Sequence, residues 1–396
     1  MQKKIHYAMT TFGESEVDAV LEVLATQKMQ LIGGDKTREM EQRVATLFGK
    51  ASACLCNSGS SANLLAMTLV KEMVDAERTQ VITPALTFGT TIGPIVQSGF
   101  EPVLVDVDLE TLQINVDQVK SLITEKTAAI CAPNLIGNPC DWAALSEIKN
   151  LNPEILLVED SADCIGYEFE GIPGSPFSDI VTTSFYASHI VTMGGTGGAI
   201  AVDDPRFDEY LRLLRGWGRS SSTFGESENI DDRFGSRGEF HYDKKFEFKR
   251  FGFNFQVSET DAAFGLAQLD SLKDNIKLRK RNHSILKKKI ETAGIGIKTF
   301  GSYPKYQPVW LAFPLLLPEG VNRSEFQVFL ERKNIQTRPI FTGNISRHEA
   351  WSHAGFEPQR FLNADKVHEN GVLVGCHQSL TVEDVERLAS AIISFF

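Results

Sequence analysis

The sequence of 396 residues predicts an α/β protein built on a largely parallel β-sheet. Beyond Gly49, short apolar runs rich in β-forming residues alternate with helical stretches. Each run is almost entirely apolar, as expected for strands that helices cover on both faces. Weaker strand and helix signals after residue 294 predict a smaller C-terminal α/β domain.

The first predicted elements are two helices. Apolar residues recur at helical spacing in two sets, Val17, Val20, Leu21 and Leu24, then Met40, Val44 and Leu47. The first helix should begin near Glu14, and the second should end at Gly49. Six predicted strands follow: Gln80–Pro84, Pro102–Val107, Ala128–Leu135, Ile155–Val158, Ile180–Phe185 and Gly198–Val202.

The second half of the chain divides at two signals. Polar residues from Ser220 to Lys245 predict a long surface loop. The sequence from Ser258 to Asp261 is a capping box that should begin a long helix. Strand, helix and strand signals follow at Val309–Leu317, Arg323–Lys333 and Gly371–Gly375. We therefore predict a large domain over 1–255, a connecting helix over 256–293 and a small domain over 294–396.

Composition excludes several classes of protein. Apolar residues make up 42% of the chain and charged residues 23%, and the net charge of -11 disfavours a nucleic-acid partner. No apolar run reaches the roughly 20 residues that span a bilayer, so no membrane partner is expected. Six cysteines are present, with no C-x-x-C pair, and we expect reduced thiols and no metal centre. The first residues show no secretory signal, so we expect a cytoplasmic location.

Three polar motifs follow or precede apolar runs. The first, Asn57 to Asn63, leads from a small polar turn into an apolar helix. Amide groups and hydroxyls at such a helix start bind phosphate well, although simple helix capping would use the same residues.

The second motif places Asp160 at the end of an apolar strand. Ligands of open α/β sheets bind beyond the carboxyl ends of the strands. A carboxylate buried there needs a cation or hydrogen bonds, and a protonated pyridine nitrogen would serve. The alternative interpretation is a cap for the turn that follows.

The third motif is the stretch SFYASHIVTMGGTGGAIA over 184–201. Its four glycines within Gly194–Gly198 permit close approach of the backbone to a ligand. His189 lies just after the strand end, although an isolated histidine is more often structural than catalytic.

The order of these motifs resembles the vitamin-B6-dependent sugar aminotransferase and dehydratase family over nearly the whole chain. The resemblance also covers GFNFQVSETDAAFGLAQL, RPIFTGN and GVLVGCHQ. It implies the aspartate-aminotransferase fold, also called fold type I, and a pyridoxal or pyridoxamine phosphate cofactor.

Aminotransferases of this family carry a Schiff-base lysine where this chain has His189. Residues 150–243 contain no lysine. Histidine at this position resembles the 3-dehydratase branch, whose members remove the C3 hydroxyl of nucleotide-linked 4-keto-6-deoxy sugars. The resemblance therefore implies a non-covalent cofactor, His189 as base and acid, and an amino donor such as L-glutamate. A histidine suits this work because its ordinary pKa lies near neutrality.

The resemblance assigns further roles by position. Gly59, Ser60 and Ser184 should hold the cofactor phosphate, Phe88 should stack on the ring, and Asp160 should pair with the pyridine nitrogen. Asn254 matches a residue that reaches the phosphate of the neighbouring subunit, which implies a homodimer with shared sites. Substrate contacts are expected from Ser188, Arg219, Arg338 and His377, although surface ion pairs would equally explain both arginines.

Two departures from the dehydratase pattern bear on the substrate. Arg215 stands where a relative of this branch has histidine, and Ser188 replaces a second histidine. One branch of dehydratases binds an iron–sulfur cluster through four cysteines in the 220–245 loop. This chain has no cysteine between Cys164 and Cys376, so we expect no cluster.

Two alternatives remain open. The first is a nucleotide-sugar aminotransferase that uses another amine, which the missing lysine disfavours. The second is a catalytically inactive relative that binds the cofactor, which the joint presence of Ser60, Phe88, Asp160 and Asn254 disfavours. The sequence leaves open the nucleotide, the sugar stereochemistry and the amino donor.

Overall fold

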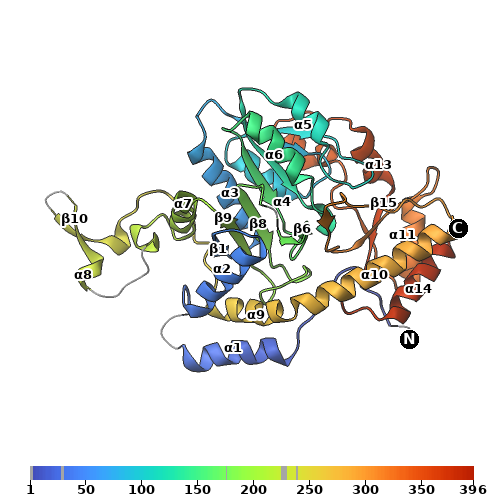
Figure 1. Cartoon of the computed structure of the whole chain (residues 1–396), viewed down its shortest axis with the longest axis horizontal. Coiled ribbons are helices and arrows are strands. Elements are labelled where there is room, and N and C mark those ends of the chain that lie inside the picture. The colour runs from blue at the N-terminus through green and yellow to red at the C-terminus, as the bar shows by residue number, and fades with distance from the viewer. Residues whose placement is uncertain (1–2, 28–30, 175, 224–229, 238–239) are drawn as a thin grey trace.

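A seven-stranded sheet forms the centre of the molecule in the computed structural model (Figure 1), which describes residues 3–27, 31–174, 176–223, 230–237 and 240–396. The strand order is β1, β9, β8, β5, β4, β2, β3. Only β9 runs antiparallel to its neighbours. In that order the strands span Ser52–Cys56, Gly198–Val202, Ile180–Ser184, Leu156–Asp160, Thr127–Pro133, Gln80–Pro84 and Glu101–Val105.

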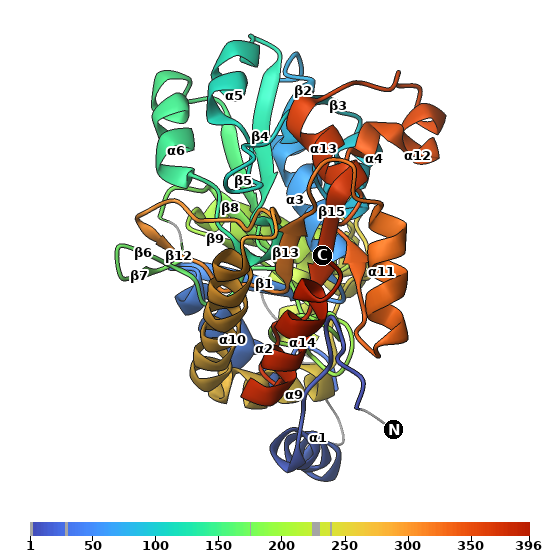
Figure 2. The same ribbon diagram turned by 90° about the vertical axis from the view of Figure 1, so that its right-hand side faces the viewer.

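Helices cover both faces of this sheet, which explains why every residue of β4, β8 and β9 is buried. Figure 2 shows α5 and α6 on the opposite side from α3 and α4. The helices of this part are α1 (Glu14–Thr26), α2 (Asp35–Leu47), α3 (Gly59–Met73), α4 (Gly89–Gln97), α5 (Val116–Leu122), α6 (Trp142–Leu151), α7 (Pro205–Arg215) and α9 (Glu259–Asp270).

A smaller antiparallel sheet lies in the C-terminal part, in the order β13, β15, β14. Ile5 of the N-terminal segment pairs with Ile335 beside it, so the start of the chain lies against the C-terminal part. The elements are α10 (Leu272–Ala293), β13 (Phe313–Leu316), α11 (Arg323–Arg332), β14 (Arg338–Pro339), α12 (Glu349–His353), α13 (Leu362–Asn370), β15 (Gly371–Val374) and α14 (Val382–Ile393). The predicted α/β fold is therefore confirmed.

Short elements complete the chain. A third sheet joins β12 (Tyr306–Gln307), β6 (Glu168–Phe169) and β7 (Ile172–Pro173). Single 3-10 turns occur at Leu135–Gly137, Ser220–Thr223, Lys244–Phe246 and Ile345–Arg347. Among the described residues, no helix combines the length and apolar character needed to cross a bilayer.

Three local expectations differ from the structure. The predicted loop 220–245 contains α8 (Ile230–Arg233) and a hairpin of β10 (Phe234–Arg237) and β11 (Phe240–Asp243) that project from the body (Figure 1). Its residues 224–229 and 238–239 lie outside the described residues.

The long helix predicted from the capping box is two helices. Ser258 does cap α9, accepting a hydrogen bond from the Asp261 amide. The helical path then breaks at Ser271, where α10 begins. The first helix packs against α1 and α2, and the second packs against α14. In place of the single connecting helix that was predicted, α9 packs with the N-terminal helices and α10 packs with the C-terminal part.

The apolar stripe of α1 points mostly outward. Val17, Leu21 and Leu24 are 45%, 55% and 53% exposed, whereas Val23 is fully buried. The helical periodicity was correct, but it did not indicate that the stripe would remain uncovered in a single chain.

Candidate active site

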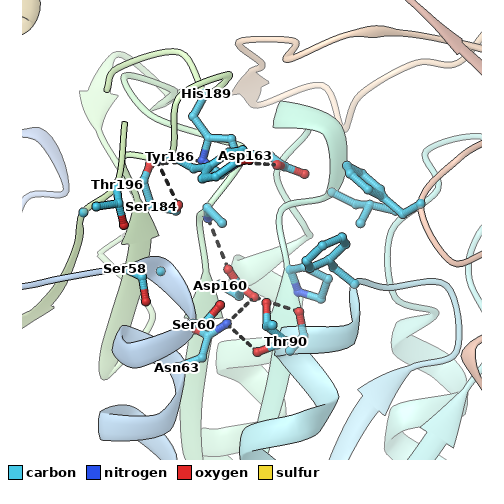
Figure 3. Close-up of a pocket in the computed structure, with 18 residues that line it drawn as sticks. Ser58, Ser60, Asn63, Thr90, Asp160, Asp163, Ser184, Tyr186, His189 and Thr196 are labelled. Atoms are coloured by element: carbon cyan, nitrogen blue, oxygen red, sulfur yellow. Dashed lines mark hydrogen bonds and ion pairs between the residues drawn. The ribbon is translucent and has the colours of Figure 1, made fainter. Parts of the chain in front are cut away.

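The pocket with the predicted site residues lies at the carboxyl ends of the parallel strands (Figure 3). The turns after β1, β2, β4, β5 and β8 all contribute, because parallel strands end at the same edge of the sheet. The cavity measures about 260 Å³. Its lining includes Gly59, Ser60, Phe88, Asp160, Ser184 and His189, six residues that the sequence analysis selected.

The start of α3 forms one wall of the pocket. Ser58 caps this helix by accepting a hydrogen bond from the Ser61 amide. A Cβ atom on Gly59 would lie 2.4 Å from Cβ of Ser184, so only glycine fits there. The backbone amides of this turn and the hydroxyls of Ser60 and Ser184 therefore border one space, which suits an anion.

Asp160 ends β5 and lies in the floor of the pocket, 5% exposed. Its Oδ2 accepts hydrogen bonds from Asn63 Nδ2 and Thr91 Oγ1, both at 2.8 Å. Figure 3 shows the side chain of Asn63 directed at Asp160. Burial raises the pKa of Asp160, and these hydrogen bonds oppose the shift. Among the residues that the structure describes, no lysine or arginine forms an ion pair with this carboxylate. A protonated ring nitrogen would supply the missing cation.

His189 is held by the strand end that precedes it. Its Nδ1 lies 3.2 Å from the carbonyl oxygen of Ser184. Because a carbonyl oxygen can only accept, Nδ1 carries the hydrogen, and the neutral ring then has its lone pair on Nε2. Burial lowers the pKa of His189 to about 4. The imidazole is therefore neutral at pH 7 and able to accept a proton.

Asp163 faces Nε2 of His189, and no sequence pattern predicted a role for it. Its Oδ1 lies 3.8 Å from His189 Nε2, while its Oδ2 accepts a hydrogen bond from the Ile136 amide. Burial raises the pKa of Asp163 to about 7. An acid and a base thus meet at one edge of the pocket.

Other lining residues were also missed. Asn63 and Thr91 bind Asp160, Tyr186 borders the imidazole of His189, and Phe341 comes from the C-terminal part. Asn63 was inside a quoted motif, but its direction follows from the turn of α3, which no residue pattern reveals.

The remaining predicted residues lie outside this lining. Ser188 is half-buried beside His189, and Asn254 is exposed, with its backbone paired to Gly216. The guanidinium of Arg219 lies 3.9 Å over the Trp217 ring.

Arg338 and His377 lie near the N-terminal segment. Arg338 is exposed on β14, 5.5 Å over the ring of Tyr7. His377 is buried, and its Nε2 lies 3.2 Å from the carbonyl oxygen of His6. A single chain therefore does not bring these two residues or Arg219 into the pocket lining.

Arg215, which stands where a dehydratase relative has histidine, forms an ion pair in the interior of the protein. Its Nη1 lies 2.8 Å from Glu41 Oε1 and 3.0 Å from the carbonyl oxygen of Leu55. Arg212 binds the other oxygen of Glu41 at 2.9 Å. These contacts fix α7 to α2 and β1.

Comparison with known proteins places this geometry in a family. The chain is 32% identical to dTDP-4-dehydro-2,6-dideoxy-D-glucose 3-dehydratase of Saccharopolyspora spinosa, with 96% of this chain and 84% of the relative covered. It is 30% identical to GDP-4-keto-6-deoxy-D-mannose 3-dehydratase of Yersinia pseudotuberculosis, with 96% of each covered.

A solved GDP-4-keto-6-deoxymannose 3-dehydratase with a trapped PLP–glutamate geminal diamine superimposes with a TM-score of 0.87. The sequences are 25% identical, and 98% of this chain and all of that chain are covered. The pyridoxal phosphate cofactor expected from the sequence is the one bound in this relative, and the fold type I expectation is confirmed. The model of the DegT/DnrJ/EryC1/StrS aminotransferase family matches residues 10–393, and the chain belongs to that family.

Proposed function

We propose that this protein is a pyridoxamine-phosphate-dependent 3-dehydratase of a nucleotide-linked 4-keto-6-deoxyhexose. One observation carries the proposal. The family position of the Schiff-base lysine holds His189, whose Nε2 is unprotonated and borders the pocket. The absence of lysine from residues 150–243 removes a covalent anchor for the cofactor from this part of the chain.

The residues present fit a non-covalent cofactor. The Gly59 turn with Ser60 and Ser184 would hold its phosphate, Phe88 would stack on its ring, and Asp160 would bind its ring nitrogen. When bound, the cofactor supplies an electron sink that makes the C3 hydroxyl of the sugar a leaving group. A cationic ring nitrogen would also neutralise the buried charge of Asp160, which has no other cation among the described residues.

His189 would move one proton. Its Nε2 would take the proton from the C4′ carbon of the cofactor and deliver it to the C3 oxygen of the departing hydroxyl. The bond from Nδ1 to the Ser184 carbonyl would keep the ring oriented and stabilise the imidazolium while it holds the proton. Asp163 Oδ1, close to Nε2, would favour that cation in its ionised form.

L-Glutamate is the proposed amino donor that restores the cofactor amine. The trapped glutamate adduct of the solved relative supports this choice. Arg338 stays a candidate for the donor carboxylate or the nucleotide diphosphate, because it is exposed and its guanidinium forms no ion pair within the described residues. Arg219 is half-buried over Trp217 and His377 is buried against His6, which makes the same role less favourable for them than for an exposed arginine.

A homodimer with shared sites is also part of the proposal. The exposed apolar residues of α1, namely Val17, Leu21 and Leu24, would be covered by a second copy. Asn254 is exposed and outside the pocket of its own chain, as a residue that serves a partner's phosphate would be.

The test begins with an absorbance spectrum of the protein with pyridoxal phosphate, before and after L-glutamate. Conversion of the aldehyde band to the amine band is expected, with no label retained after borohydride reduction and denaturation. Incubation with a panel of 4-keto-6-deoxy nucleotide sugars should then release one ammonia per sugar consumed.

Each alternative gives a different result. An aminotransferase would consume the sugar without releasing ammonia. An inactive relative would bind the cofactor without converting it. Either result would contradict the proposed dehydration.

A further inference from the structure

A segment of the C-terminal part reaches the cofactor pocket and is fixed there. Thr342 Oγ1 donates a hydrogen bond to the carbonyl oxygen of Thr87 at 2.7 Å. The Ile345 amide donates to the carbonyl oxygen of Ala85 at 2.9 Å, and Leu86 pairs with Asn344 as an antiparallel bridge. The segment therefore binds the same turn that presents Phe88.

The backbone is strained where this segment enters the pocket. Phe341 has a φ of +43°, in the left-handed region that a bulky residue rarely adopts. Such strain persists only where the surroundings impose it, and it gathers at functional sites.

The contacts that hold the backbone in this conformation are made by the residues immediately after Phe341. The carbonyl oxygen of Thr342 accepts hydrogen bonds from His348 Nε2 at 2.8 Å and His368 Nδ1 at 3.2 Å. Gly343 lies so close to His368 that a Cβ atom would be 2.7 Å from its Cα. Together with the hydrogen bond to the Thr87 carbonyl, these contacts fix the backbone conformation of the segment.

The strained conformation directs an aromatic ring into the pocket lining. The rings of Phe341 and Phe88 meet edge to face, with centroids 5.9 Å apart and planes at 78°. Phe341 is half-buried, whereas Phe88 is 51% exposed. Edge-to-face contact is a favoured geometry that fixes the orientation of both rings.

We propose that Phe341 is a positioning residue that holds the ring of Phe88 ready to stack on the cofactor. It also closes the pocket from the C-terminal part, so both parts of the molecule contribute to cofactor binding. The inference rests on the proposed function in one respect, namely that Phe88 stacks on the cofactor ring.

The test uses two variants that remove the same ring. Phe341→Ala keeps the strained backbone position occupied by a residue with Cβ, whereas Phe341→Gly relieves the strain. We expect both to raise the dissociation constant for pyridoxal phosphate about tenfold, and Phe341→Gly to melt at a higher temperature than Phe341→Ala without cofactor. Equal melting temperatures of the two variants would contradict the backbone strain at Phe341. Dissociation constants equal to that of the wild type would contradict the role of the ring.

A double-mutant cycle tests whether Phe341 acts through Phe88. Phe88→Leu alone should weaken cofactor binding, and adding Phe341→Ala should weaken it by less than in the wild-type background. If the increases in the dissociation constant from the two substitutions simply multiply in the double variant, Phe341 does not act through Phe88. The near-ultraviolet circular dichroism of bound cofactor reports ring orientation, and it should decrease in Phe341→Ala at saturating cofactor. An unchanged signal would also contradict positioning.

Glu170→Gly is the matched control. Glu170 also has a positive φ, +50°, and is exposed in a hairpin outside the pocket. This variant should bind cofactor like the wild type. If the wild-type protein itself fails to bind pyridoxal phosphate, the proposed function fails. If the wild type binds and both Phe341 variants bind equally well, only this inference fails.

Discussion

Asp163 and His189 face each other, with the carboxylate Oδ1 3.8 Å from the Nε2 nitrogen of the imidazole. The other imidazole nitrogen is bound to the Ser184 carbonyl. In the familiar acid–base triads a carboxylate orients the histidine from its far side. Here the carboxylate lies on the Nε2 side, where the proposed proton transfer would occur, so it would influence a proton bound to Nε2.

His189→Asn should lower the rate of sugar dehydration about 100-fold or more, because the amide cannot accept a proton. Cofactor affinity should stay within a few-fold, since Asp160 and the turn proposed to hold the phosphate are unchanged. Single-turnover measurements and a cofactor titration check both expectations. Dehydration at the parent rate would show that another group is the base.

His189→Lys provides the complementary test. A lysine amine at this position should capture the pyridoxal aldehyde, so borohydride reduction should leave the label attached to the denatured chain. Mass spectrometry of peptides would locate it. Label found at a different lysine would place the reactive centre elsewhere.

Asp163→Asn should change how stability depends on pH. The pKa of Asp163 is raised to about 7, so the native carboxyl keeps a proton that the unfolded chain has lost. Wild-type stability from this group therefore falls as pH rises from about 4 to about 7. The melting temperature of the cofactor-free variant, relative to wild type, should increase over that range and then level off. A difference that stays constant with pH would contradict the assignment.

His189 acts in the opposite direction over part of this range. Its pKa is lowered to about 4, so the unfolded chain binds more protons between about 4 and 6.5, and stability rises with pH there. In the Asp163→Asn variant this contribution should remain visible, and in the double variant with His189→Asn it should disappear.

Gly59→Ala should disrupt the turn that is proposed to hold the cofactor phosphate. The added methyl group would lie 2.4 Å from Cβ of Ser184, so the turn or β8 must shift. We expect cofactor affinity to fall and the free energy of unfolding to drop by about 1–3 kcal/mol. Gly93→Ala in α4 is the control, because nothing lies within 4 Å of its added Cβ, and it should be neutral or stabilising.

Arg215→Ala should destabilise the fold without affecting substrate affinity. Arg215 and Glu41 have side chains 14% and 8% exposed, and breaking a buried pair costs about 3 kcal/mol. The KM for the nucleotide sugar should change less than twofold. Arg206→Ala, which removes an exposed pair, should leave stability nearly unchanged. A selective rise in KM would contradict this structural role and place Arg215 at the substrate site.

Mixing two inactive variants would test the shared sites. A heterodimer of His189→Asn and Asn254→Ala chains keeps one site with both native residues if Asn254 serves the partner. Activity should therefore reappear on mixing and subunit exchange. Mixed chains that form heterodimers and stay inactive would contradict the sharing.

Sequence patterns located the residues whose position follows from a strand end. Asp160 and His189 follow apolar runs, so their meeting at one sheet edge could be predicted. Asp163 and Phe341 could not, because their directions depend on a turn and on a strained backbone angle. Asp163 lies three residues after Asp160, but nothing in the sequence showed that its Oδ1 would face the imidazole.

The spacing of apolar residues predicted where helices form, but it predicted less well which of their residues are buried. The apolar period of α1 indicated a helix, but tertiary contacts decided that Val23 would be buried and Leu21 exposed. The break between α9 and α10 at Ser271 could not be predicted, because no glycine or proline lies beside it. β1 was missed because none of its five residues, Ser52–Cys56, is β-branched or aromatic, so the run lacks the composition that marked the other strands.

The pocket lining extends from Ser58 to Phe341, so it exists only when distant parts of the chain are folded together. A ligand that binds there favours the native state by mass action, by about 2.7 kcal/mol at a hundred times its dissociation constant. A lysine-anchored enzyme keeps its cofactor on dilution, whereas a non-covalent one loses it. If the cofactor binds without a covalent bond, as proposed, the thermal stability of this protein should therefore rise with the free cofactor concentration around it.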